Sequence, residues 1–238
     1  MYGGLSIGAV VVAAGKGKRM GAEVNKLFLE INNKPVLAYT LEAFESSQYV
    51  DSIIIAANEN EMDYIKKDII DRYKINKIKK SISLVAGGEI RQQSIIKGLS
   101  ELKGACDIIV THDGARPLVT SQIIDLSVEE AEKYGAAACA VPLKDTIKVV
   151  DEEGFVLSTP ERATLYAIQT PQTFKFDILF SAHREAVKNE FIGTDDTVLV
   201  ERLGFKIKLF SGSYENIKVT TPEDIYIAEA ILNNRKRG

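Results

Sequence analysis

Continuous apolar runs alternate with amphipathic stretches along the chain, and this alternation constrains the fold more than any other feature. Several runs lack the polar–apolar alternation of a half-exposed strand, which is typical of strands covered on both faces. The predicted strands are Ile7–Ala13, Ser52–Ala57, Ser81–Val85, Asp107–Thr111, Ala136–Val141 and Lys206–Phe210. The predicted helices lie near 35–46, 60–73, 89–103, 120–134, 176–189, 195–203 and 222–234. This order predicts an α/β fold: a single Rossmann-like domain over 1–238, with a mainly parallel twisted sheet flanked by helices.

The segment at about 142–168 departs from that rhythm. Two short β-prone runs, Thr146–Val150 and Phe155–Ser158, are joined by an acidic turn that ends in Gly154, and this pattern predicts a β-hairpin. A two-stranded hairpin is only marginally stable in water by itself. It therefore needs a surface to rest on, either its own domain or a second copy of the chain. We favour the second copy and expect a homodimer formed through this protruding β-arm.

Composition excludes several classes of function. The net charge is -3, so no global field attracts nucleic acid or an anionic membrane. Cys106 and Cys139 lack CxxC spacing, and His112 and His183 are the only histidines, which argues against a disulfide framework and a His/Cys metal site. We find neither a membrane-spanning apolar run nor a secretory signal. The expectation is a cytoplasmic protein with no nucleic-acid or membrane partner.

The loop after the first predicted strand carries the strongest functional signal. Ligands of open parallel sheets bind beyond the carboxyl ends of strands, where glycines let backbone N–H groups approach a polyphosphate. A Walker loop is excluded because it requires Lys and then Ser or Thr after its last glycine, whereas Gly21 is followed by Ala22 and Glu23. A dinucleotide fingerprint requires G-x-G-x-x-G, and here the third glycine comes one residue late. The surplus of cations favours a triphosphate. These loop residues are Gly15, Gly17 and Gly21, with the cations Lys16, Lys18, Arg19 and Lys26.

Five motifs in a fixed order carry a family resemblance. They are Ala13-Ala14-Gly15-x-Gly17-x-Arg19-Met20 with Asn25-Lys26-Leu27-Phe28, then Gly87-Gly88-Glu89-x-Arg91-x-x-Ser94, Val110–Pro117, Val141–Thr146 and Asn216–Asp224. With them the chain resembles the sugar-phosphate nucleotidyltransferases, and among these the 2-C-methyl-D-erythritol 4-phosphate cytidylyltransferase family of non-mevalonate isoprenoid biosynthesis. The resemblance covers residues 7–230.

The resemblance implies that an acceptor phosphate attacks the α-phosphorus of CTP and pyrophosphate leaves. Such a transfer needs positioning and charge neutralisation rather than a covalent nucleophile. The implied cofactor is Mg²⁺, held mainly by the CTP phosphates. The implied catalytic residues are Arg19, Lys26, Arg162 and Lys218; the nucleotide-binding residues are Ala13, Ala14, Gly15, Gly88, Glu89, Ser94 and Gly114; the acceptor-binding residues are Asp113, Arg116, Thr146 and Thr170.

Some assignments stay open at this point. Many relatives carry Asp where this chain has Glu89, so backbone groups there are an alternative reader of the cytosine amine, and Glu89 as a helix cap is another. Asp113 suits a sugar hydroxyl, which the resemblance favours, or Mg²⁺. The resemblance also implies that Thr146 and Arg162 act in the partner subunit's site. The pair Asp195-Asp196 is interpreted as a capped helix start rather than a metal site.

Two other functions compete with this interpretation. The first is ribitol 5-phosphate cytidylyltransferase, which shares the chemistry and differs in the acceptor. The second, from a different class, is a nucleotide-binding protein without catalysis, which would not need Arg19, Lys26 and Lys218 together.

Overall fold

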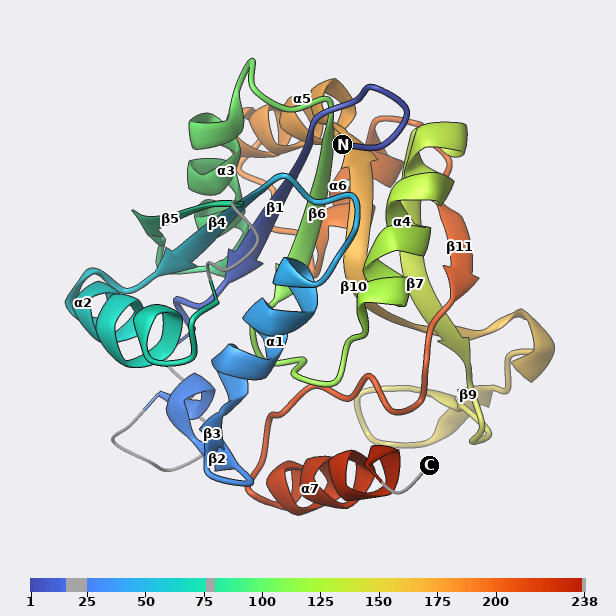
Figure 1. Ribbon diagram of the computed structural model, residues 1–238. Coiled ribbons are helices and arrows are strands. Elements are labelled where there is room, and N and C mark those ends of the chain that lie inside the picture. Colours follow the sequence, from blue (N-terminus) through green and yellow to red (C-terminus); the bar gives the residue numbers. More distant parts are fainter. Residues whose placement is uncertain (16–24, 76–79, 237–238) are drawn as a thin grey trace.

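The computed structural model describes residues 1–15, 25–75 and 80–236, and its centre is a twisted sheet (Figure 1). In this described part the sheet has seven strands in the order β11-β7-β10-β6-β1-β4-β5. The strands are β1 (Ile7–Val12), β4 (Ser52–Ala57), β5 (Ser81–Ala86), β6 (Ile108–Asp113), β7 (Ala136–Pro142), β10 (Tyr166–Lys175) and β11 (Lys208–Ser211). The strands predicted from sequence are confirmed, and the sheet is mostly parallel as expected.

Strand β10 is the element that the sequence interpretation got wrong. Residues 169–172 lie inside β10, which is not among the predicted strands and runs antiparallel to both of its neighbours, β6 and β7. The register with β7 shifts between Ile168 and Gln172, and the Thr170–Pro171 peptide bond in this stretch is cis. Because proline has no N–H to donate and polar residues flank it, the stretch does not show a strand pattern.

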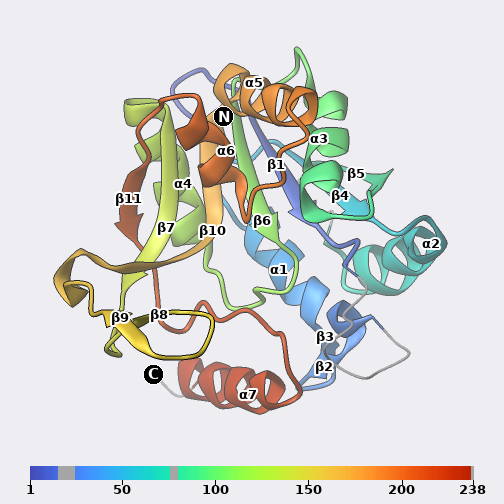
Figure 2. The ribbon, with the colours of Figure 1, turned by 180° about the vertical axis from the view of Figure 1, so that it is seen from behind.

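Helices cover both faces of the sheet (Figures 1 and 2). On one face lie α1 (Val36–Glu45), α4 (Ser121–Tyr134) and α2 (Met62–Tyr64), which continues into a π-helical segment, Ile65–Asp71. On the other lie α3 (Arg91–Leu102), α5 (Phe176–Lys188) and α6 (Asp196–Arg202). Each face of the sheet has its own hydrophobic core. In β1, the side chains of Ile7, Ala9 and Val11 pack into the core under α1 and α4, that of Val10 packs into the core under α3 and α5, and all four are fully buried. Two-sided burial explains the unbroken apolar run.

Capping residues end and begin the helices at the expected places. Gly135 has φ 84°, a left-handed conformation that suits glycine, and its N–H closes α4 on the Ala131 carbonyl. The Asp195 side chain accepts from the N–H of Val198, which confirms the capped helix start. α7 (Glu223–Arg235) begins where the Asp224 carboxylate accepts from the N–H groups that precede it.

The predicted hairpin is confirmed as β8 (Val149–Val150) paired antiparallel with β9 (Val156–Ser158). A second small ladder joins β2 (Glu30–Ile31) to β3 (Lys34–Pro35). The hairpin and α7 lie beyond the same end of the sheet (Figures 1 and 2). Phe155 and Leu157 on the hairpin are 66% and 65% exposed. Among the helices in the described ranges, none combines the length and the apolar character needed to cross a bilayer.

Candidate active site

A pocket of about 150 Å³ opens at the carboxyl ends of β1, β5 and β6. The chain builds β4 and β5 on one side of β1, and α3 then returns it to β6 on the other side. Ligands of open α/β sheets bind at such a reversal of strand order. The pocket is lined by Val12, Ala14, Gly15, Lys26, Leu27, Gly88, Glu89, Ile90, Arg91, Ser94, Asp113, Ala115 and Lys218.

The loop after β1 contributes Ala14 and Gly15 to this lining. Ala13 and Gly114, also predicted to contact the nucleotide, are buried in the wall behind it. Their N–H groups donate to carbonyls of neighbouring strands at 2.7 and 2.9 Å. Ala13 therefore ties the end of β1 to β4, and Gly114 ties the end of β6 to β1. Arg19 lies outside the described residues.

The turn after β5 is fixed by the first turn of α3. The Gly88 N–H donates to Ser94 Oγ over 3.0 Å, and Ser94 Oγ lies 3.3 Å from the Ile90 carbonyl, to which it donates. A Cβ on Gly88 would lie 2.2 Å from the Cβ of Gln93, so the close approach requires glycine. The Glu89 side chain is exposed at the pocket, and α3 has no side-chain cap. The capping alternative for Glu89 is therefore wrong.

Two lysines from distant parts of the chain meet at the pocket. Lys26 begins a short 3₁₀ turn capped by Asn25, and its Nζ donates to the Val219 carbonyl over 3.0 Å. That bond ties Lys26 to the segment that carries Lys218. Lys218 Nζ lies 2.6 Å from Asp113 Oδ2. The two predicted cations are thus brought together in the lining of one pocket, which Asp113 also lines.

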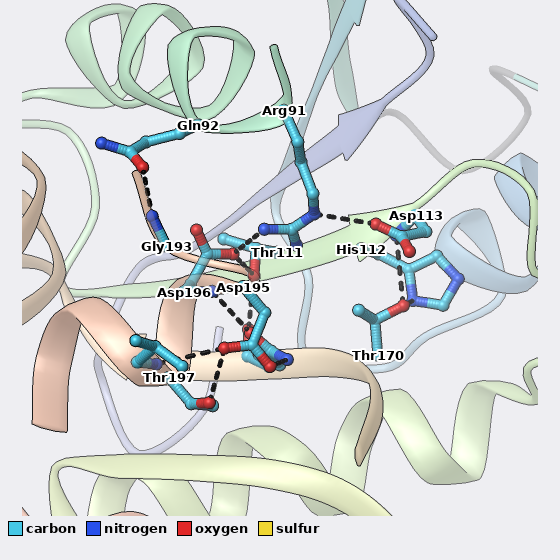
Figure 3. A network of polar contacts seen from close by, with 12 residues as sticks. Arg91, Gln92, Thr111, His112, Asp113, Thr170, Gly193, Asp195, Asp196 and Thr197 are labelled. Atoms are coloured by element: carbon cyan, nitrogen blue, oxygen red, sulfur yellow. Dashed lines mark hydrogen bonds and ion pairs between the residues drawn. The ribbon is translucent and has the colours of Figure 1, made fainter. Parts of the chain in front are cut away.

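Asp113, the last residue of β6, is held between two cations. Its Oδ1 accepts from Arg91 Nε over 2.9 Å, and its Oδ2 pairs with Lys218 (Figure 3). Burial by itself raises the pKa of Asp113, but the charges of Arg91 and Lys218 outweigh it and hold the pKa well below its ordinary value. The carboxylate is therefore charged throughout the neutral pH range.

Arg91 is the site residue that the sequence analysis left without a role. Its Nη1 lies 2.8 Å from Asp196 Oδ2, so the guanidinium bridges Asp113 and Asp196 (Figure 3). Asp196 also accepts from Thr111 Oγ1 over 2.7 Å and pairs with His183 Nε2 over 3.0 Å. The signal that could have found Arg91 is its position in the first helical turn after a glycine-rich strand exit, with an acidic pair elsewhere in the chain to receive it.

A second pocket of about 190 Å³ adjoins the first and shares Arg91, Asp113 and Lys218 with it. Arg116, half-buried, donates from Nη1 to the Asn216 carbonyl over 2.7 Å, and burial lowers its pKa. The second pocket is lined by Arg91, Asp113, Arg116, Ile168, Gln169, Thr170, Gln172, Thr194, Asp195 and Lys218. The predicted acceptor-binding residues Asp113, Arg116 and Thr170 are therefore brought together.

The arm residues Thr146 and Arg162 lie apart from both pockets. Both are exposed, and Arg162 donates from Nη1 to the Lys144 carbonyl over 3.0 Å. Neither lines the described pockets of its own chain. Their predicted role in a partner subunit stays a prediction.

Comparisons with known proteins agree with this geometry. The family model of 2-C-methyl-D-erythritol 4-phosphate cytidylyltransferase matches residues 7–234. The chain belongs to this family. It is 47% identical over 228 residues to the 2-C-methyl-D-erythritol 4-phosphate cytidylyltransferase of Caldanaerobacter subterraneus subsp. tengcongensis, which covers 96% of this chain and 99% of the relative. The corresponding protein of Alkaliphilus metalliredigens is 49% identical over 229 residues, covering 96% and 94%.

A solved structure extends the likeness to three dimensions. The 4-diphosphocytidyl-2C-methyl-D-erythritolsynthase from Anaerococcus prevotii DSM 20548 superposes with a TM-score of 0.85 at 34% identity, covering 97% of each chain. The chain is therefore a nucleotidyltransferase of the cytidylyltransferase family. Within the described residues of this cytidylyltransferase, no three His, Cys, Asp or Glu side chains cluster as ligands for a metal ion.

Proposed function

We propose that this cytidylyltransferase binds CTP in the first pocket and 2-C-methyl-D-erythritol 4-phosphate in the second. The observation that carries the proposal is the wall common to both pockets, formed by Arg91, Asp113 and Lys218. A nucleotide and an acceptor in these adjoining pockets would have their reacting phosphates beside the same three side chains. Proximity of this kind supplies a large part of the rate enhancement in group transfer.

The reaction joins an oxygen of the acceptor phosphate to the α-phosphorus and breaks the bond to the β-phosphate, releasing pyrophosphate. Both reacting groups are anionic, so their approach needs positive charge, which Lys26 and Lys218 supply. In the structure, Lys218 pairs with Asp113 at 2.6 Å. We propose that Lys218 exchanges this carboxylate for phosphate oxygens when CTP binds, and that Asp113, still charged and held by Arg91, turns to a hydroxyl of the sugar. The role of Arg19 as a further cation stays a prediction from sequence.

The cytosine base is proposed to lie against the turn formed by Gly87–Glu89. Because the Gly88 N–H is already bonded to Ser94, the turn presents its remaining backbone groups and the exposed Glu89 carboxylate to a ligand. A hydrogen-bond-accepting oxygen at this place selects the exocyclic amine of cytosine, which donates. Ser94 therefore acts by holding the turn in shape.

A divalent cation fits this site as a partner of the nucleotide. Mg²⁺ prefers phosphate oxygens and water together with one or two carboxylates, and Asp113 is the buried carboxylate that both pockets share. Such an ion neutralises charge on the triphosphate. The CTP phosphates would supply most of its ligands, because Asp113 is assigned to the sugar hydroxyl.

We further propose a homodimer in which the arm, at 142–168 of a single domain, covers the partner's acceptor pocket. Phe155, Val156 and Leu157 are each more than half exposed, which is an apolar surface that a lone chain leaves in water. Arg162 and Thr146 on the same arm would then grip the acceptor phosphate across the interface. The cytoplasmic location stays a prediction.

The experiment is pyrophosphate release with CTP and a panel of acceptors. We expect turnover with 2-C-methyl-D-erythritol 4-phosphate and little with ribitol 5-phosphate. Equal turnover with ribitol 5-phosphate, or CTP binding without any release, would overturn the assignment.

A mixing experiment tests the shared site. Lys218→Ala removes a cation within one chain, and Arg162→Ala removes one that acts in the partner. Each variant alone is expected to be inactive, whereas a mixture of the two contains dimers with one complete site and regains activity. A mixture as inactive as its components would refute the exchange of arms.

A further inference from the structure

The Thr170 side chain lies at the wall of the second pocket and has two polar neighbours. Its Oγ1 is 3.1 Å from the backbone nitrogen of Asp113 and 3.0 Å from Nδ1 of His112 (Figure 3). The ladder between β10 and β6 runs no further than the pair Gln172 and Thr111, so the Thr170 hydroxyl takes the Asp113 N–H beyond the end of the ladder. Thr170 is almost fully buried and His112 fully so.

The donors and acceptors around His112 fix where the hydroxyl proton goes. A backbone N–H only donates, so Asp113 uses one lone pair of Thr170 Oγ1. The other ring nitrogen, Nε2, lies 3.4 Å from the Arg116 carbonyl, which only accepts. In a neutral ring Nε2 must then carry the hydrogen, and Nδ1 is left with a lone pair. The single proton of the Thr170 hydroxyl therefore points to Nδ1.

The opposite tautomer fails on the same geometry. It would place the Nε2 lone pair against the carbonyl oxygen of Arg116, two acceptors with no proton between them. The ring also packs against Phe44, with ring centroids 5.1 Å apart, and burial is the main cause that lowers the pKa of His112 to about 3. The ring is therefore neutral at physiological pH.

We propose that His112 is a positioning residue that makes Thr170 a hydrogen-bond acceptor toward the bound acceptor substrate. With its proton donated to Nδ1 and one lone pair used by Asp113, the hydroxyl has one lone pair left for the pocket. It accepts from a hydroxyl of a polyol and repels a phosphate oxygen. This inference rests on the proposed use of the second pocket, and it assigns the polyol chain rather than the phosphate to Thr170.

Two matched variants test the role of the ring. His112→Asn retains an acceptor oxygen near the position of Nδ1, whereas His112→Leu has similar branching and no acceptor. Removing a hydrogen bond between neutral groups costs about 1 kcal/mol, or several-fold in binding. We expect His112→Leu to raise KM for 2-C-methyl-D-erythritol 4-phosphate about fivefold to tenfold with KM for CTP unchanged, and His112→Asn to restore most of the loss. Equal impairment of both variants would overturn the proposal.

The 1-, 2- and 3-deoxy analogues of the acceptor identify the hydroxyl. With the wild type, one of these analogues is expected to have a lower kcat/KM than the full acceptor. With His112→Leu or Thr170→Val, the same analogue is expected to have the same kcat/KM as the full acceptor. A penalty that persists in His112→Leu would contradict the mechanism. If the wild type does not use 2-C-methyl-D-erythritol 4-phosphate at all, the proposed function fails instead, so the two failures are distinct.

A spectroscopic measurement reads the tautomer of the ring directly in the wild-type protein. The chain has two histidines, His112 and His183, so ¹⁵N long-range spectra of histidine-labelled protein contain two ring systems. We expect the His112 ring to be the neutral Nε2–H tautomer, assigned by its loss from the spectrum of His112→Asn. The Nδ1–H tautomer or a charged ring at neutral pH would overturn the proposal.

Discussion

The bridge from Asp113 through Arg91 to Asp196 predicts a measurable loss of stability in the Asp196→Asn variant. Asp196 is buried and accepts from three donors, Arg91 at 2.8 Å, Thr111 at 2.7 Å and His183 at 3.0 Å. A hydrogen bond to a charged group is worth about 1 kcal/mol more than one to a neutral group. Three such bonds give about 3 kcal/mol, which agrees with the lower end for breaking a buried ion pair.

Urea unfolding at neutral pH measures this loss. For a chain of this size, with m of about 3 kcal/mol/M, the midpoint of Asp196→Asn is expected to fall by about 1 M. The matched control is Asp195→Asn one position earlier, at a half-exposed side chain. The asparagine oxygen still accepts from Val198 N and Thr197 Oγ1, and only the bond from Gln172 Nε2 is lost, so the midpoint should fall much less than in Asp196→Asn.

The same variant carries a pH dependence with a definite sign. Burial by itself raises the pKa of Asp196, but the Arg91 charge and the bonds from His183 and Thr111 bring it below the ordinary value of 3.8. A carboxyl whose pKa is lower in the folded state stabilises the fold at a pH above its unfolded-state pKa. This stabilisation is lost as the pH falls toward the folded-state pKa. The difference between wild type and Asp196→Asn should therefore be constant above pH about 5 and shrink below pH about 4. Equal midpoints for Asp196→Asn and Asp195→Asn at neutral pH would refute the reasoning.

Three further predictions concern the nucleotide pocket and the arm. Gly88→Ala forces a Cβ to within 2.2 Å of Gln93, and we expect KM for CTP to rise at least tenfold in steady-state assays, with a much smaller change in KM for the acceptor. Lys26→Ala removes a cation from the triphosphate and should lower kcat by about 100-fold or more, with folding unchanged by circular dichroism; a kcat within threefold of wild type would contradict its role. Replacing Phe155 and Leu157 together by Ser should shift the chain from dimer to monomer in light scattering, and an unchanged mass would remove the arm from the interface.

The parallel part of the fold was predictable because strands covered on both faces carry an unbroken apolar pattern. Val10 and Val11 face different cores and are both fully buried, so the sequence of β1 reads as a strand without ambiguity. Strand β10 carries no such pattern. Its middle, with polar side chains and Pro171, is shaped by the edges of β6 and β7, which are tertiary partners.

The candidate site divides along the same line. Lys26 begins a 3₁₀ turn, Asp113 ends β6, and Lys218 lies in the short segment before α7, so their positions in the sequence indicate the site. Arg91 and Asp196 are distant in sequence, and only the folded structure shows that they form a pair. The proposed role of Arg162 involves a second chain, so no pattern within one chain indicates it.

The most direct test of the account is a crystal structure with CTP and a non-reacting analogue of the acceptor. We expect cytosine against Gly88, the acceptor in the pocket next to Thr170, and Lys218 moved from Asp113 onto a phosphate oxygen. The two reacting phosphates should meet beside the residues that line both pockets. A nucleotide found away from β1 and β6, or Lys218 still paired with Asp113 while both ligands are bound, would contradict the account.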